Sequence, residues 1–145
     1  EKRIEILRRK LKESELDAVL ISKPENCFYL SGFTGSSGVL FVTREEALLF
    51  TDFSYIIKAK EETQGLTVME WERPVWKDFA SKIRKLDINN FGFESDFLTL
   101  SQHSKIVEAV HPLEMKELDG FVEALRVVKD SEEIGKIRQE CLRRG

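Results

Sequence analysis

Side chains that could ligate a metal or act as nucleophiles are few and far apart in this 145-residue sequence. The histidines and cysteines are Cys27, His103, His111 and Cys141, and neither a CxxC pair nor an HExxH motif is present. Because a metal site needs ligands that converge, the sequence predicts no metal site. We interpret both histidines as packed or surface residues, with His103 on the inward side of a helix.

Three glycines at a spacing of three residues, Gly32, Gly35 and Gly38, mark a predicted loop that begins at Asn26. The loop lacks the lysine of a phosphate-binding P-loop and leads into a strand rather than a helix, so it matches neither nucleotide-binding motif. The run of residues 35–38, Gly-Ser-Ser-Gly, is also one residue short of the GxSxG pattern of serine hydrolases. Two interpretations stay open from the residues alone, a tight connection and a recognition surface.

Uninterrupted apolar runs after the loop predict strands that are buried on both faces. Residues 39–42 and 47–50 show no polar alternation, and a hairpin is predicted to turn through residues 43–46. Further strands are predicted at residues 18–21, 66–71, 90–94 and 113–117. The last of these alternates apolar and charged residues, which favours an edge position in the sheet.

Apolar residues at helical spacing predict helices between the strands. These helices are expected near residues 4–11, 52–64, 74–86, 99–109 and 118–128. Asp52 is expected to cap its helix and to place Phe53 and Ile57 on the inner side, while Thr99 and Gln102 have the spacing of a capping box. The alternation of strands and helices around one hairpin predicts a three-layer α/β domain with a mixed sheet of about six strands.

Composition and charge limit the class of protein. The chain fits one globular domain, and a formal net charge of -3 gives no overall field that favours nucleic acid. The basic residues at 8–12 are interpreted as the solvated face of a helix. No apolar run approaches the ~20 residues of a membrane span, so no membrane partner is expected. Two distant cysteines suggest no disulfide framework, and a cytoplasmic location is the default.

A motif surrounds the hairpin: Asn26, Tyr29, Leu30, Gly32, Phe33, Thr34, Gly35, Ser36 and Gly38, followed by Thr51, Asp52 and Tyr55. It resembles the amino-terminal domain of the creatinase, prolidase and aminopeptidase P family of "pita-bread" metallopeptidases. Members of that family often have Thr at the position of Ser31 and Arg at the position of Ser54. The segment 127–134 also resembles the linker that leads into the catalytic domain of that family.

The resemblance implies a sheet flanked by helices with a ribonuclease-H-like motif. It implies that the parent protein is an Xaa-Pro aminopeptidase or dipeptidase, a hydrolase of proline-containing peptides that uses two divalent metal ions, manganese, cobalt or zinc. Those ions belong to the carboxyl-terminal domain of the family, so this fragment is expected to hold no cofactor and to be inactive alone.

The resemblance also implies a role for this domain in dimers, or larger oligomers, and in substrate access. The corresponding interface loop is Phe33, Thr34, Gly35, Ser36 and Ser37. Because Phe33 is flanked by glycines, we further predict that its ring is an exposed contact rather than part of the core. An alternative from another class is a non-enzymatic peptide- or histone-binding module of the same fold.

The domain boundary is predicted where composition changes, near Lys129. Residues 1–129 are assigned to the creatinase and prolidase type of amino-terminal domain, and residues 130–145 to a linker and first helix that lead into the catalytic domain. In residues 131–145, Ile134, Ile137 and Cys141 form an apolar stripe. We expect this stripe to pack on the catalytic domain.

Overall fold

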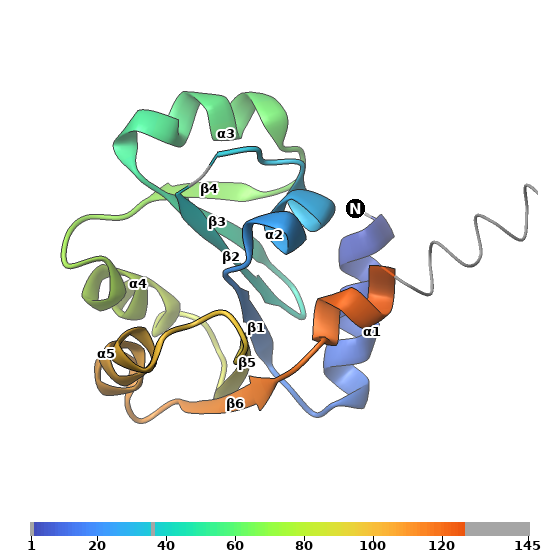
Figure 1. Ribbon diagram of the computed structural model, residues 1–145, viewed down its shortest axis with the longest axis vertical. Helices are drawn as coiled ribbons and strands as arrows, with labels where there is room; N and C mark the ends of the chain where they lie inside the picture. The colour runs from blue at the N-terminus through green and yellow to red at the C-terminus, as the bar shows by residue number, and fades with distance from the viewer. Residues whose placement is uncertain (1, 36, 127–145) are drawn as a thin grey trace, which may run out of the picture.

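Residues 2–35 and 37–126 are described by a computed structural model (Figure 1). The strands are β1 (Ala18–Ile21), β2 (Gly38–Thr43), β3 (Ala47–Thr51), β4 (Thr67–Glu70), β5 (Asn90–Glu94) and β6 (Glu114–Leu118). They form one six-stranded sheet in the order β4-β3-β2-β1-β5-β6. Only β2 is antiparallel to its neighbours, so the mixed sheet with one hairpin is confirmed.

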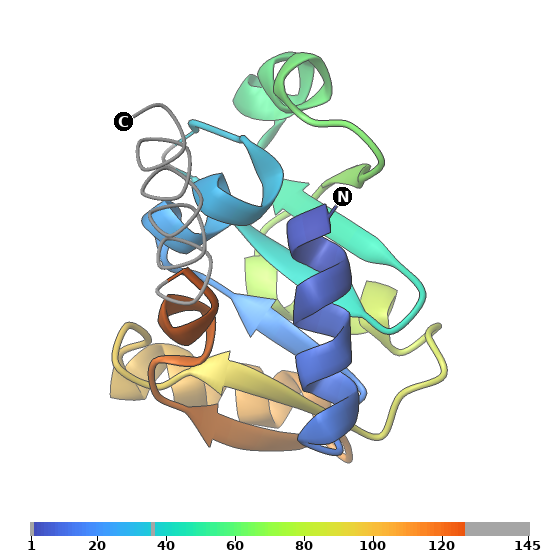
Figure 2. The same cartoon turned by 90° about the vertical axis from the view of Figure 1, so that its right-hand side faces the viewer.

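Helices cover both faces of this sheet. They are α1 (Lys2–Glu13), α2 (Pro24–Ser31), α3 (Ile56–Glu62), which follows the 3-10 turn η1 (Phe53–Tyr55), α4 (Val75–Ile83) and α5 (Leu100–Val110). Residues 121–126 are also helical. Figure 2 shows that α1 and residues 121–126 share one face of the sheet, and α4 and α5 lie on the other. The three-layer prediction is therefore confirmed.

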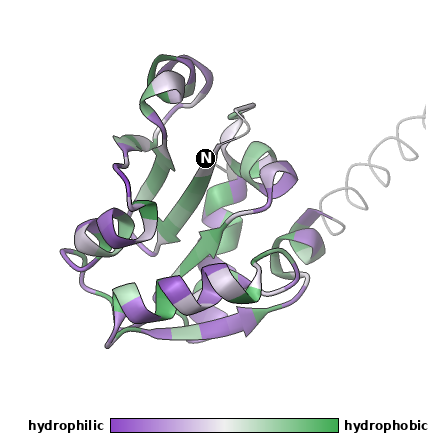
Figure 3. Ribbon diagram, turned by 60° about the vertical axis from the view of Figure 1, so that its left-hand side comes forward, coloured by the Kyte–Doolittle hydropathy of each residue, from purple (hydrophilic) through white to green (hydrophobic). Residues whose placement is uncertain are grey.

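The two apolar cores follow from alternation along the central strands. Val19 and Leu40 point to the face of α1, α2 and α3, whereas Leu20 and Phe41 point to the face of α4 and α5. Both faces of β2 and β3 are buried, as their uninterrupted apolar sequences predict. Figure 3 shows the resulting hydrophobic centre of the sheet, with hydrophilic residues along the edge strand β6.

Local chemistry explains several boundaries. Thr99 accepts a hydrogen bond from the backbone N–H of Gln102, and the side chain of Gln102 accepts one from the N–H of Thr99, which confirms the capping box. Gly32 ends α2 in the left-handed conformation, with φ at 83°, where a residue with a Cβ would be strained.

Two predictions about local structure are wrong. Residues 24–31 form α2 rather than a loop. The buried residues of this helix are Asn26, Cys27 and Leu30. They do not form an amphipathic pattern, so the sequence does not reveal the helix. The predicted helix at residues 52–64 is present as a 3-10 turn followed by α3, but its predicted inner side is wrong, because Phe53 and Ile57 are exposed. The predicted boundary near Lys129 and the predicted helix at 131–145 lie outside the described residues.

Candidate functional site

Most of the predicted site residues gather at one edge of the sheet. Strands β1, β3, β4, β5 and β6 all run in the same direction, so their carboxyl ends lie together with the start of β2. In open α/β sheets, ligands bind outside these ends at the point where the strand order reverses. Here that point lies between β1 and β5, because the chain builds outward from β1 to β4 and then returns to the other side of β1.

The glycine loop wraps around a buried phenylalanine. Phe33 is only 2% exposed, and its ring packs edge-on against Tyr55 with 6.2 Å between ring centroids. A Cβ on Gly35 would lie 2.1 Å from the Phe33 ring, so glycine is required there by close packing. The prediction that Phe33 is an exposed contact is wrong, because the missing side chain at Gly35 makes the space that its ring fills.

The remaining loop residues are tied to the segment that follows the hairpin. The backbone N–H and the hydroxyl of Thr34 donate hydrogen bonds of 3.0 and 2.6 Å to the carboxylate of Glu62, and these bonds lower the pKa of that carboxyl. Ser37 Oγ donates to Asp52 Oδ2 over 2.6 Å, and Trp71 Nε1 donates to Asp52 Oδ1 over 3.0 Å. Thus Asp52 joins the loop to Trp71, the residue that follows β4, instead of capping a helix. The loop is bound to its neighbours on both sides of Gly35.

Asn26, another predicted motif residue, is fully buried at the point where the strand order reverses. Its side-chain amide donates to Glu94 Oε2 over 2.5 Å, and Glu94 Oε1 accepts from the backbone N–H groups of Ser22 and Lys23 over 2.7 and 2.8 Å. Burial raises the pKa of Glu94, and these N–H donors oppose that shift. The carboxylate of Glu94 therefore occupies the position where a sheet of this kind would bind an anionic ligand.

A buried lysine completes this arrangement. Lys23 Nζ donates to the carboxylates of Asp96 and Glu123, the second over 2.5 Å. Both acceptors hold the pKa of Lys23 above its usual value, and hydrogen bonding to Lys23 lowers the pKa of Asp96. We call Lys23, Asn26, Glu94, Asp96 and Glu123 the Glu94 cluster.

Residues around the Glu94 cluster have packing roles. Arg126 donates to Asn26 Oδ1 over 3.2 Å. The guanidinium carbons of Arg3 and Arg126 lie 4.1 and 5.7 Å from the ring centroid of Tyr29. Tyr29 thus joins α1 and residues 121–126 to α2, which assigns a structural role to this motif residue.

The Glu94 cluster does not fit a metal ion. Its carboxylate oxygens already accept N–H groups, and the ammonium of Lys23 occupies the place of a cation. Over residues 2–35 and 37–126, no group of three or more His, Cys, Asp or Glu residues could hold a metal ion. His103 packs against Phe93, with 4.8 Å between ring centroids. Burial raises the pKa of the Cys27 thiol to about 12, so it is not a reactive thiolate.

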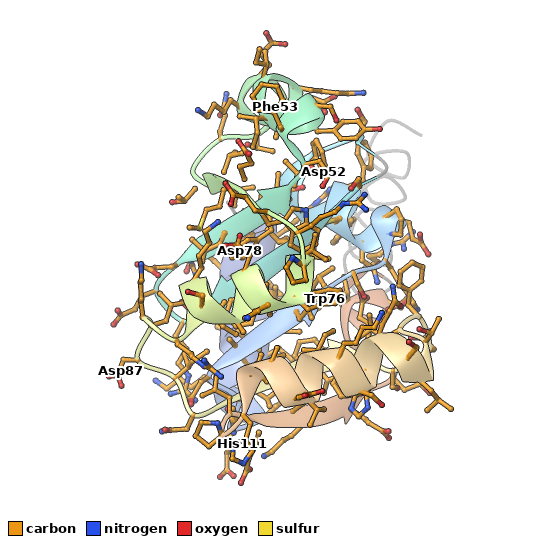
Figure 4. All side chains as sticks on the ribbon, turned by 90° about the vertical axis from the view of Figure 1, so that its left-hand side faces the viewer. Asp52, Phe53, Trp76, Asp78, Asp87 and His111 are labelled. Carbon is orange, nitrogen blue, oxygen red and sulfur yellow. The ribbon has the colours of Figure 1, made fainter. Side chains whose placement is uncertain are left out.

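A groove opens at the other end of the same edge, and sequence reasoning missed it. It has a volume of about 1120 Å³ and begins beside Ser37 and Asp52. Its walls include the side chains of Trp71, Arg73, Trp76, Lys77, Lys105 and Glu108, from the end of β4, the start of α4 and the length of α5. We call it the Trp76 groove. Figure 4 shows Asp52 and Trp76 on this face, with Phe53 beyond Asp52.

Two apolar side chains next to the loop are exposed. Phe53 is 79% exposed and Ile57 is 73% exposed, on the turn and helix that Thr34 contacts through Glu62. The sequence marks both residues as apolar but does not show which way they point. No spacing pattern marks the Trp76 groove, because its walls come from segments far apart in the chain.

No helix in the described part of the chain is long and apolar enough to cross a membrane.

Comparison with known proteins places these features in a family. The model of the creatinase/prolidase N-terminal domain matches residues 3–128. The chain is similar to an uncharacterized peptidase, YqhT, of Bacillus subtilis, with 30% identity over 139 residues that cover 96% of this chain and 39% of that protein. It is similar to an Xaa-Pro dipeptidase of Pyrococcus furiosus, with 31% identity over 140 residues, 96% of this chain and 38% of that protein.

Solved structures share the fold. An Xaa-Pro dipeptidase from Bacillus anthracis has a TM-score of 0.82 at 31% identity, over 86% of this chain and 35% of that chain. The N-terminal domain of the cytoplasmic peptidase PepQ from Mycobacterium tuberculosis has a TM-score of 0.78 at 34% identity, over 86% of this chain and 98% of that chain. The chain thus spans about two-fifths of the length of the two curated relatives above.

Proposed function

This chain belongs to the creatinase/prolidase N-terminal domain family, and from that premise we propose that it is the non-catalytic domain of an Xaa-Pro peptidase. In this role it supports assembly of the enzyme as a dimer and shapes the access of proline-containing peptides to a catalytic domain. We also propose that the catalytic domain holds the two divalent metal ions. A cytoplasmic location is proposed by analogy with the M. tuberculosis relative.

The observation that carries the proposal is the exposed apolar pair beside the bound loop. Phe53 and Ile57 are 79% and 73% exposed, and exposed apolar side chains of this size on adjacent turns favour an interface. Thr34 fixes the loop to α3 through Glu62, so the loop and the apolar pair form one surface of fixed shape. Such a surface can narrow the entrance to a pocket and exclude long peptides by shape.

The burial of Phe33 changes which residues we propose for this role. Phe33 is buried, so it supports the surface from beneath, and Phe53 provides the exposed aromatic ring. Thr34 is exposed, while Gly35 and Ser37 are half-buried. We therefore assign substrate access to Thr34, Phe53 and Ile57, with Gly35 and Ser37 in supporting positions.

The test uses the protein in which this chain is joined to its catalytic domain. We expect Phe53→Ser with Ile57→Ser to weaken the dimer, measured by light scattering during size-exclusion chromatography, and to change the ratio of kcat/KM values for a dipeptide and a longer Xaa-Pro peptide. Leu100→Ser is the matched control, since Leu100 is 87% exposed on α5 and belongs to neither the loop nor α3. An unchanged dimer and an unchanged ratio in the double variant would contradict the proposal.

A further inference from the structure

The Trp76 groove carries positive charge that the protein does not neutralise. Among the described residues, the side chains of Arg73, Lys77 and Lys105 have no hydrogen-bond or ion-pair partner, although all three residues line the groove. Other cations nearby are engaged. Lys82 pairs with Asp78 over 2.7 Å, and Arg84 donates to the carbonyl oxygens of Ala109 and His111.

Acidic side chains in and beside the groove do not cancel this charge. Asp52 has both carboxylate oxygens occupied, by Ser37 and by Trp71. Asp78 accepts from Lys82 and from the backbone N–H of Glu72. Glu108 is the remaining carboxylate among the lining residues, against three cations whose side chains have no partner in the described part of the chain. The groove therefore has an excess of positive charge.

The groove also offers an aromatic surface. Trp76 is half-buried and packs edge-on against Trp71, with 5.5 Å between ring centroids. Trp71 is in turn tilted against Phe50, so the pair is anchored in the core. A rigid tryptophan at the floor of a groove contributes apolar contact without a large loss of conformational entropy on binding.

Another pocket shows the opposite pattern. At the other edge of the sheet, a pocket of about 470 Å³ is lined by Asp17, Arg44 and Lys85 among others. Asp17 accepts from the backbone N–H of Asn89 over 2.7 Å, and Arg44 donates to the carbonyl oxygen of Leu16 over 3.2 Å. Its lining also contains Glu45, Glu46 and Asp87, so carboxylates outnumber the cations Arg44 and Lys85, and this pocket has no excess of positive charge.

We propose that the Trp76 groove binds an acidic polypeptide segment, with carboxylates facing Arg73, Lys77 and Lys105 and an apolar side chain against Trp76. The charges of such a segment complement those of the groove. A polypeptide is favoured over nucleic acid because Glu108 interrupts the cations, which suits spaced carboxylates better than a continuous phosphate backbone. This site goes beyond the proposed function and does not depend on a catalytic domain.

The test uses the 145-residue chain and two synthetic peptides. One contains Asp, Glu and Gly around a central Leu, and the other has Asn and Gln in place of the acids. Titration is followed by tryptophan fluorescence and by calorimetry. We expect the acidic peptide to bind at least about tenfold more tightly than the neutral one, and to weaken as salt is added.

Two charge-reversal variants test whether the acidic peptide binds at the groove or is attracted only by the overall charge of the domain. Lys77→Glu with Lys105→Glu should weaken the acidic peptide about tenfold or more. Lys58→Glu with Lys60→Glu changes the net charge by the same amount on α3, away from the groove, and should change affinity less than about twofold. Equal weakening in both variants would overturn the proposal, as would equal binding of the two peptides. Tighter binding of a single-stranded oligonucleotide than of the acidic peptide would also overturn it.

Discussion

The Glu94 cluster and the Trp76 groove lie at the same edge of the sheet and are both rich in charge, yet they differ in how the charge is used. In the Glu94 cluster, Lys23 is matched by Asp96 and Glu123, and Glu94 accepts three N–H groups. In the Trp76 groove, the side chains of Arg73, Lys77 and Lys105 are exposed and have no partner among the described residues. The comparison separates two uses of charge: paired groups that hold segments of the fold together, and unpaired cations that we propose bind a partner.

The largest expected effect is the difference in unfolding free energy between a variant of a buried aromatic residue, Phe33, and a variant of an exposed one, Phe53. Phe33→Ala should lower the free energy of unfolding by about 4 kcal/mol, because it removes a ring that is 2% exposed. Phe53→Ala should change it by less than about 0.5 kcal/mol, because that ring is 79% exposed. Urea denaturation followed by circular dichroism measures both. Similar losses in the two variants would show that the loop does not enclose Phe33.

A second pair compares the charged regions directly. Glu94→Ala should lower the free energy of unfolding by about 3 kcal/mol, since it leaves the N–H groups of Ser22, Lys23 and Asn26 without their acceptor. Glu108→Ala, at the groove, should cost less than about 0.5 kcal/mol. The same denaturation experiment applies. If the two variants were equally mild, the Glu94 cluster would not be a structural element.

A smaller effect concerns pH. Burial raises the pKa of Glu94 above its ordinary 4.5, so between 4.5 and the raised value the folded state binds more protons than the unfolded state. Stability contributed at this position therefore falls as pH rises through that interval. The difference in unfolding free energy between the natural chain and Glu94→Gln should decrease over the same interval.

The other carboxylates of the cluster do not obscure this measurement. The pKa of Asp96 is lowered by its hydrogen bond from Lys23, so its stabilising contribution is lost only as pH falls below its ordinary value. Burial raises the pKa of Glu123, but the hydrogen bond and charge of Lys23 act together with hydrogen bonds from the Glu123 backbone N–H and from Asn26 to lower it, so Glu123 behaves in the same direction. Because the pKa values of both groups are lowered, their titration lies mainly below this interval of pH. A difference that stays constant or increases with pH would contradict the assignment.

Much of the fold could be predicted from the sequence, because burial on both faces leaves a direct pattern. The apolar runs at 39–42 and 47–50 predict β2 and β3, and the predicted strand at 66–71 contains β4. The capping box at Thr99 is a local motif, so it is also predictable.

The site was less predictable, because its geometry depends on contacts between distant segments. Asn26 is polar and buried, while Phe28 on the same helix is 54% exposed, so α2 has no amphipathic pattern. In the sequence, Glu94 is only an acidic residue at the end of a predicted strand. Its role depends on hydrogen bonds from Ser22, Lys23 and Asn26, which are 68 or more residues away in sequence. Phe33 is enclosed only because Gly35 leaves room for its ring.

Amide hydrogen exchange tests the contrast between the closed cluster and the open groove most directly. The N–H groups of Ser22 and Lys23 donate to the buried carboxylate of Glu94, so they should exchange as slowly as the amides of β2. The N–H groups of Val75 and Trp76 lie in the first turn of α4, beside the groove, where no carbonyl one turn earlier accepts them, and they should exchange rapidly. Exchange at Ser22 and Lys23 as fast as that at Trp76 would contradict the account.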